Sequence, residues 1–297
     1  MNRVDETRQE PSEPEPEQGF IRELGQFFVI PSLIVLLCVG VFVMFGLISS
    51  ESKGVRDFLQ EIRTSRGNDR WQAAFEMSRA IAQQPALRGD ERLVREIADA
   101  IRSEGRDDPK VRKYLVIALE KLGSVSAGPI LVESLSDSDP EVRMQAARAL
   151  GAIEGVTGAV EPLGALSTDE DASVRKVAVF ALGRTHDPAA VTPLRPRLDD
   201  PVEDVRWNAA LALAVLGDAS GRSVIEQMLD RSHLDAIEGI TEEQKVLALI
   251  NGVQAVYLLK DTTLAEKVRT LSREDPSLKV REIAIRALES LDRSTGA

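Results

Sequence analysis

The stretch from Asp139 to Ile153 reads DPEVRMQAARALGAI, and two later stretches repeat its pattern. Residues 171–185 read DASVRKVAVFALGRT, and residues 203–217 read EDVRWNAALALAVLG. The Val-Arg pairs begin at Val142, Val174 and Val205, so the spacings are 32 and 31 residues. A nearly fixed period of this length is typical of repeat proteins, in which each unit stacks on the next.

Each unit predicts a pair of antiparallel helices. In the first unit apolar residues recur at steps of three and four, which places them on one helical face. Asp139 and Pro140 form a start signal, because Asp caps a helix and Pro fits its first turn. A second apolar segment follows at residues 159–166, 190–198 and 223–229. We expect the first helices to stop at Gly151, Gly183 and Gly217.

This unit resembles the HEAT repeat, and more narrowly the short variant named after the phycobilisome lyases. The residues that carry the resemblance are Asp139, Pro140, Val142, Arg143, Ala146, Ala147, Ala149, Leu150 and Gly151. The resemblance implies an all-α solenoid in which the repeated Asp and Arg side chains hydrogen-bond between neighbouring repeats. This structural ladder would comprise Asp108, Arg112, Asp139, Arg143, Asp171, Arg175, Asp204, Arg206, Asp275 and Arg281.

The array extends over residues 68–297 as about six to seven repeats. Trp71 and Phe75 open a divergent first repeat, and we expect both in the core. From Val205 to its next equivalent, Val246, the spacing is 41 residues, so about ten extra residues form an insertion at 231–242. Such insertions map to loops on one face, often the binding face. The last unit, from Asp275, has one helix and should cap the array.

The chain before the repeats divides into three segments. Residues 1–26 carry seven acidic and three basic residues with a Pro-Glu alternation, which predicts a disordered acidic tail. Residues 27–48 are 22 residues without a charge and predict a single transmembrane helix. A signal peptide is the alternative, but it would have a basic leader and a shorter apolar core. Residues 49–67 predict a juxtamembrane helix and linker.

The flanking charges orient this predicted anchor. Within about 20 residues of the segment, Arg8 and Arg22 precede it. Lys53, Arg56, Arg63 and Arg66 follow it, which favours a cytoplasmic solenoid. We therefore expect a single-pass protein of a bacterial inner membrane.

Composition limits the function classes. The net charge of −11 argues against nucleic-acid binding, which needs a basic surface, and permits basic protein partners. Cys38 is the single cysteine, and His186 and His233 have no Cys or His cluster nearby, so we expect no metal site. The sequence has no Gly-rich phosphate loop and no catalytic triad motif. We therefore expect no catalytic residue, no cofactor, no small-molecule substrate and no enzyme activity.

Two regions are candidate partner contacts, with an ordinary solvated surface as the alternative. One is the local basic group of Arg184, Arg195 and Arg197, where Pro196 should also shorten the second helix. The other is the insertion, with His233, Asp235 and Glu238.

The sequence thus predicts a membrane-anchored scaffold or adaptor that binds protein partners through a HEAT-like solenoid. A regulatory or assembly subunit of a membrane complex, such as a transporter, is the second hypothesis. A lyase-like enzyme related to the bilin lyases is the third.

Overall fold

The computed structural model describes residues 28–49, 53–103 and 108–295, with backbone alone at 30, 45–49 and 294–295. It divides into one unit at Met1–Lys53 and a second at Gly54–Ala297. The predicted tail at residues 1–26 lies outside the described residues. Each unit is described below by itself.

The first unit contains helix α2 (Ile30–Ser49), which coincides with most of the apolar segment. A search of the described residues finds no helix long and apolar enough to cross a membrane. This finding overturns the predicted anchor at 27–48, and with it the predicted inner-membrane location and orientation.

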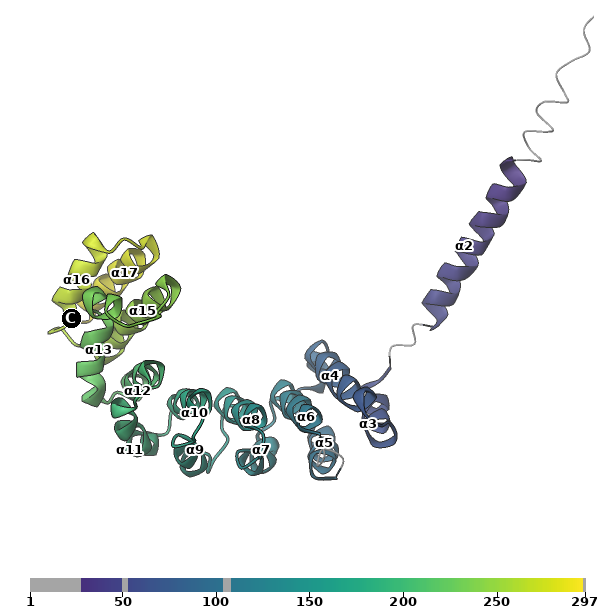
Figure 1. Cartoon of the computed structure of the whole chain (residues 1–297), viewed down its shortest axis with the longest axis horizontal. Helices are drawn as coiled ribbons and strands as arrows, with labels where there is room; N and C mark the ends of the chain where they lie inside the picture. Colours follow the sequence, from purple (N-terminus) through teal and green to yellow (C-terminus); the bar gives the residue numbers. More distant parts are fainter. Residues whose placement is uncertain (1–27, 50–52, 104–107, 296–297) are drawn as a thin grey trace, which may run out of the picture. The chain divides into compact units, whose positions relative to one another are not determined.

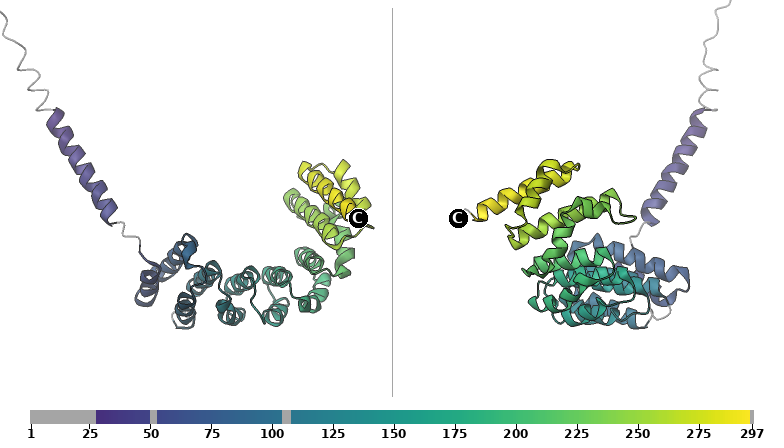
Figure 2. Two further views of the ribbon diagram at one scale, coloured as in Figure 1. Left: turned by 180° about the vertical axis from the view of Figure 1, so that it is seen from behind. Right: turned by 60° about the vertical axis from the view of Figure 1, so that its left-hand side comes forward.

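The second unit is a solenoid of two helical layers (Figure 1). Seven helices form what we call the concave layer, because they lie on the inside of the curve (Figures 1 and 2). These are α4 (Asn68–Ala82), α6 (Pro109–Leu122), α8 (Pro140–Ala152), α10 (Ala172–Arg184), α12 (Glu203–Val215), α15 (Glu242–Leu259) and α17 (Leu278–Thr295).

The convex layer lies on the outside of the same curve (Figure 2). Its helices are α3 (Val55–Thr64), α5 (Glu91–Ser103), α7 (Gly128–Ser134), α9 (Val160–Leu166), α11 (Val191–Leu194), α13 (Arg222–Met228) and α16 (Ala265–Glu274). Short 3-10 turns lie at Pro85–Leu87, Val125–Ala127, Pro188–Ala190, Arg195–Asp199 and Ala219–Gly221. The repeat formed by α10 and α11 has the shortened second helix that Pro196 predicted. Helix α11 ends at Leu194, and the chain continues as a 3-10 turn. The predicted all-α repeat solenoid is confirmed.

Helix starts follow the sequence signals, but two of the predicted stops do not. The carboxylates of Asp108, Asp139 and Asp171 accept hydrogen bonds from the backbone N–H two residues on, at 2.7–2.9 Å. Gly217, with φ of 76°, follows the end of α12. Gly151 and Gly183 instead lie inside α8 and α10.

These two helical glycines let neighbouring helices approach closely. A Cβ atom at Gly183 would lie 2.7 Å from the Cβ and 2.9 Å from the Cα of Ala212 in α12. A Cβ at Gly151 would lie 3.0 Å from the Cα of Ala181 in α10. The helix-stop interpretation of these glycines was therefore wrong, since they serve packing between repeats.

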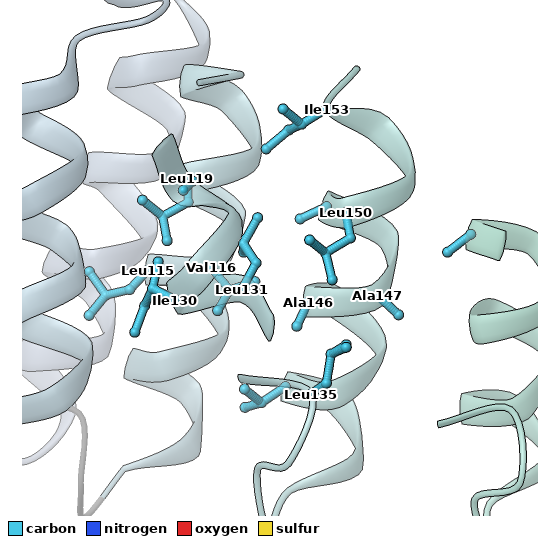
Figure 3. Close-up of a cluster of buried hydrophobic side chains, with 14 of the residues drawn as sticks. Leu115, Val116, Leu119, Ile130, Leu131, Leu135, Ala146, Ala147, Leu150 and Ile153 are labelled. Carbon is cyan, nitrogen blue, oxygen red and sulfur yellow. The ribbon is translucent and has the colours of Figure 1, made fainter. Parts of the chain in front are cut away.

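The core runs between the layers (Figure 3). One cluster of buried side chains extends from Val55 to Leu213, and a second extends from Trp207 to Leu291. Leu115, Leu131 and Ala146 are fully buried where α6, α7 and α8 meet. Burying one such leucine contributes about 1.5–3 kcal/mol, so each repeat depends on its neighbours for stability.

The insertion is partly helical. Residues 231–242 were predicted as a loop, but α14 (Arg231–Asp235) occupies its first half, capped by Asp230. The burial pattern also moves the repeat register. Ala248 is buried and Lys260, twelve residues later, has a φ of 52°, as Val205 is buried and Gly217 has a positive φ. The equivalent of Val205 is therefore Ala248 and not Val246.

Candidate interaction surface

An arginine–aspartate ladder joins consecutive concave helices. Arg143 Nε and Nη2 donate to the two carboxylate oxygens of Asp169 at 2.8 and 3.1 Å. Its Nη1 donates to the carbonyl oxygen of Asp137 at 2.8 Å. Each guanidinium therefore holds its own repeat and the next one, with the bidentate geometry that planar guanidinium groups favour.

The same arginine–aspartate pair, which we call a rung of the ladder, occurs in the repeat before Arg143 and in the repeat after it. Arg112 binds Asp137 at 2.6 and 2.8 Å, and Arg175 binds Asp200 at 2.8 and 3.0 Å. The Asp200 side chain is only 2% exposed. Burial alone would raise its pKa, but hydrogen bonds from Arg175 and from the Val202 N–H outweigh burial and lower the pKa. The ladder is thus a row of partly buried ion pairs.

Four of the five predicted ladder aspartates lie elsewhere. Asp108, Asp139 and Asp171 cap their helices, and Asp204 pairs with Lys176 at 3.1 Å. The carboxylates that bind the arginines stand five residues before the repeat valine. They are Asp137, Asp169, Asp200 and Asp275, before Val142, Val174, Val205 and Val280. Of these, only Asp275 was predicted, although the same spacing is present in the sequence at all four positions.

The ladder changes after α12. Arg206 pairs with Glu203 of its own helix and donates to the Asp200 carbonyl at 2.6 Å. In the next repeat the arginine position is held by Leu249, which is fully buried. Arg231 of the inserted α14 takes over, and its Nε and Nη2 bind the Asp275 carboxylate at 2.9 and 3.1 Å. Arg231 therefore fills the ladder position that Leu249 leaves, although the sequence analysis did not include it. The predicted ladder residue Arg281 belongs to the following helix, α17.

The predicted basic group does not gather at one site. Arg195 binds Asp218 at 2.7 Å, whereas Arg197 donates to the Ser167 carbonyl at 3.2 Å. Arg184 points from the end of α10 to the Gly151 carbonyl at 3.4 Å. Burial would raise the pKa of Asp218, but hydrogen bonds from Ser220 and Arg195 lower it. Each of these arginines thus contacts a different loop or helix end.

The other candidate contacts lie around α14. His233 is half-buried and its backbone N–H helps to cap the helix on Asp230. Asp235 is bound by Lys245 at 2.5 Å, and Glu238 is exposed. Lys245 lowers the pKa of Asp235. A cleft of about 400 Å³ lies beside Arg231 and Asp275, and the ladder pair forms part of its wall.

An aromatic cluster that the sequence placed in the core lies on the concave layer. The Trp71 and Tyr114 rings are 6.3 Å apart and stacked, and the Phe75 ring meets Tyr114 edge-on at 5.2 Å. Phe75 is 38% exposed and Trp71 is half-buried, so the expectation of core positions was only partly met. Lys110 Nζ lies 5.5 Å over Trp71, and Lys113 Nζ lies 5.2 Å over Tyr114. These distances are within cation–π range.

Further apolar side chains continue along the same layer. Phe180 on α10 is 48% exposed, and Leu247 and Tyr257 on α15 are exposed to a similar degree. Between α15 and α17 a groove of about 290 Å³ is lined by Ile250, Tyr257, Ile283 and Ala287, among others. Helical spacing could have suggested these residues, because each stands on the face opposite the buried one.

The described residues contain no group of three or more His, Cys, Asp and Glu side chains that could hold a metal ion. The ladder and helix-capping carboxylates described above are bound by arginine side chains or by backbone N–H groups.

Comparison with known proteins identifies the family of this solenoid. HEAT repeats match residues 55–150, 94–168 and 160–244, which together cover 190 of the 297 residues. The chain belongs to the HEAT repeat family. No curated protein sequence matches it.

Solved structures agree on the fold. The CpcE–CpcF complex of phycocyanin lyase from Nostoc sp. PCC7120 is similar at 18% identity and a TM-score of 0.51, over 82% of this chain and 96% of that one. A designed armadillo repeat protein in complex with the peptide (KR)4 has 19% identity and a TM-score of 0.45, over 80% of this chain and 100% of that one. An engineered protein has 23% identity and a TM-score of 0.45, with 80% and 96% covered. The likeness to the CpcE–CpcF complex shows the fold alone. A HEAT repeat solenoid is a scaffold suited to protein binding, because its stacked repeats present an extended surface.

Proposed function

We propose that this HEAT repeat protein binds a protein partner along its concave layer and acts by binding rather than by catalysis. The observation that carries the proposal is the set of exposed aromatic side chains on three of the concave helices. Phe75, Phe180 and Tyr257 are each 38–48% exposed, on α4, α10 and α15. Large exposed apolar groups on one face typically mark an interaction site, and curved solenoids use extended faces in this way.

The clefts between repeats are less suited to a partner than the concave layer. The clefts beside Arg112 and Arg143 are walled by ladder ion pairs whose atoms already bind one another. A partner that bound there would have to replace those contacts. The concave layer presents side chains that have no such internal role.

Site-specific photo-crosslinking tests the proposal. A benzophenone amino acid would replace Phe180 in the full-length chain, and a control would carry it at Val125, which is 56% exposed in the turn between α6 and α7. We expect one protein to crosslink at position 180 and not at 125, and its yield to fall when Phe75 is changed to Ala. Equal crosslinking at both positions would place the partner elsewhere and overturn the proposal.

We also propose that the protein has no lyase activity. The likeness to the CpcE–CpcF complex of phycocyanin lyase, at 18% identity, extends to the fold alone. Incubation of the purified protein with a bilin and a candidate acceptor protein should leave the acceptor unmodified by mass spectrometry. A covalent adduct would return the enzyme hypothesis.

A further inference from the structure

The N-terminal half of the concave layer has a charge opposite to that of the whole chain. Besides the ladder arginines, the side chains of α4, α6, α8 and α10 that are not buried include four acidic residues, which are Asp69, Glu76, Glu120 and Glu141. They include eight basic residues, which are Arg70, Arg79, Lys110, Lys113, Lys121, Arg148, Lys176 and Arg184. The whole chain has a net charge of −11, so these basic residues are concentrated on this face.

Three of the four acidic residues of this face are paired with cations. Glu76 is paired with Arg79 at 3.6 Å, and one cation of the face, Lys176, is paired with Asp204 of α12 at 3.1 Å. Glu141 is bound by Lys113 at 2.6 Å. Glu120 is shared by Lys121 and Arg148, both at 3.1 Å. Glu120 is largely buried, with 12% of its side chain exposed, whereas its two cations are 41% and 47% exposed. The potential that a partner meets is therefore set by the lysine and arginine side chains.

Aromatic groups stand among these cations. Lys110 and Lys113 lie over Trp71 and Tyr114, and Phe75 is open beside them. The Trp71 indole nitrogen is buried and makes no hydrogen bond to any described atom. Phe180 on α10 is a further exposed aromatic side chain, three repeats after Phe75. A ligand for this face needs carboxylates for the cations and an apolar or aromatic anchor for the rings.

We propose that the surface formed by α4, α6, α8 and α10 binds an acidic protein segment that carries an aromatic or large apolar anchor residue. The inference rests on the proposed function and names the chemistry of the partner. The acidic net charge permits basic partners, but we expect an acidic one here, because binding depends on the local potential of the docking face. Binding should weaken as salt rises, since exposed charges separated by more than a Debye length, about 8 Å at physiological ionic strength, are screened.

Fluorescence anisotropy with two synthetic peptides tests the inference on the full-length protein. One is a 14-residue Asp/Glu-rich peptide with a central Phe, and the other is the same peptide with every acid changed to Lys. We expect the acidic peptide to bind at least tenfold more tightly. A peptide with the central Phe changed to Ser should lose several-fold in affinity, and so should the Phe75→Ala protein.

Charge reversals on the two layers give the matched control. Lys110→Glu with Arg148→Glu changes the proposed face, and Arg92→Glu with Arg95→Glu changes exposed residues of α5 on the convex layer by the same total charge. We expect the concave pair to weaken the acidic peptide at least tenfold and the convex pair to weaken it less than twofold. Circular dichroism confirms that both variants fold.

The outcomes separate this inference from the proposed function. Equal weakening by both pairs, or tighter binding of the lysine peptide, would overturn the acidic-segment inference. The proposed function would still stand if the partner crosslinked at position 180. Loss of that crosslink alone, with acidic peptide binding retained, would overturn the proposed partner site and leave the charge preference of the face intact.

Discussion

The repeats before α12 and those after it are held together differently. Between α6 and α12 each rung joins an arginine to an aspartate 25 or 26 residues later, and α8 and α10 each carry a glycine where the next helix approaches. After α12 the insertion breaks the period, Leu249 replaces the arginine, and Arg231 reaches Asp275 across 44 residues. The buried side chains also form separate clusters on the two sides. An insertion can thus be accommodated where it supplies a substitute for the contact that it displaces.

The largest expected effect comes from a rung of the regular half. Asp200→Ala leaves the Arg175 guanidinium, 12% exposed, without its carboxylate and removes the turn contact to the Val202 N–H. Breaking a buried pair in this way costs about 3 kcal/mol. Urea unfolding measures the loss, and the neighbouring exposed Asp199→Ala is the control, expected within about 0.5 kcal/mol of the parent. Equal stabilities of the two variants would mean that the ladder does not hold the repeats.

The substitute contact should have a smaller and more local effect. Arg231→Ala leaves Asp275, whose side chain is 0% exposed, without its guanidinium partner. We expect a loss of about 2 kcal/mol, because the Ser277 N–H still binds that carboxylate. Hydrogen exchange should rise in α16 and α17 and stay unchanged from α6 to α12. The exposed Arg273→Ala is the control, and uniform loss of protection along the solenoid would contradict a separate C-terminal half.

The helical glycines offer a third comparison. Gly183→Ala would bring a Cβ to 2.7 Å from Ala212 Cβ and 2.9 Å from its backbone, so α10 and α12 must separate. We expect a loss of about 1–2 kcal/mol despite the better helix propensity of alanine. Gly252→Ala in α15 meets only side-chain atoms of Met228 and Leu229, the closest at 3.1 Å, which can shift. Its thermal midpoint should therefore fall less, and the reverse order would refute the close-approach argument.

The pH dependence of stability follows from Asp200. Its pKa is lower in the folded state than in the unfolded chain, so the unfolded state binds the extra proton in acid. The contribution is complete above the unfolded pKa, near 4, and is lost as the pH falls through the folded pKa. The free energy of unfolding should decrease more steeply below about pH 4 in the parent than in Asp200→Asn. Parallel curves of the free energy of unfolding against pH would show that ionisation of Asp200 does not contribute to the stability of the ladder.

The smallest effect should come from the surface pair of Arg195. Its side chain is 57% exposed, so Arg195→Ala should cost less than about 1 kcal/mol, although it binds Asp218. The same denaturation experiment measures it. A loss as large as that of Asp200→Ala would show that the exposed pairs, and not the buried rungs, distinguish the two halves.

The sequence predicted the repeats well because their information is local. Caps such as Asp139, the apolar spacing after Val142 and the effect of Pro196 depend on residues within one helix or turn, and all three appear in the structure.

Contacts between repeats were harder to predict. The pairing of Arg143 with Asp169 depends on how one loop faces the next helix, which no local pattern encodes. Arg231 was missed because its partner is 44 residues away and outside the period. Phe75 and Trp71 carry the same apolar signal as core residues, but Phe75 is 38% exposed in the structure.

Asp137 belongs to two interfaces at once, since its carboxylate binds the arginine before it and its carbonyl binds the arginine after it. A copied segment of one period that contains Asp137 and Arg143 would carry one acceptor and one donor for its new neighbours. Gene duplication could then lengthen the array by whole units without any compensating substitution. The residues that join one repeat to the next are therefore duplicated together with the repeat itself.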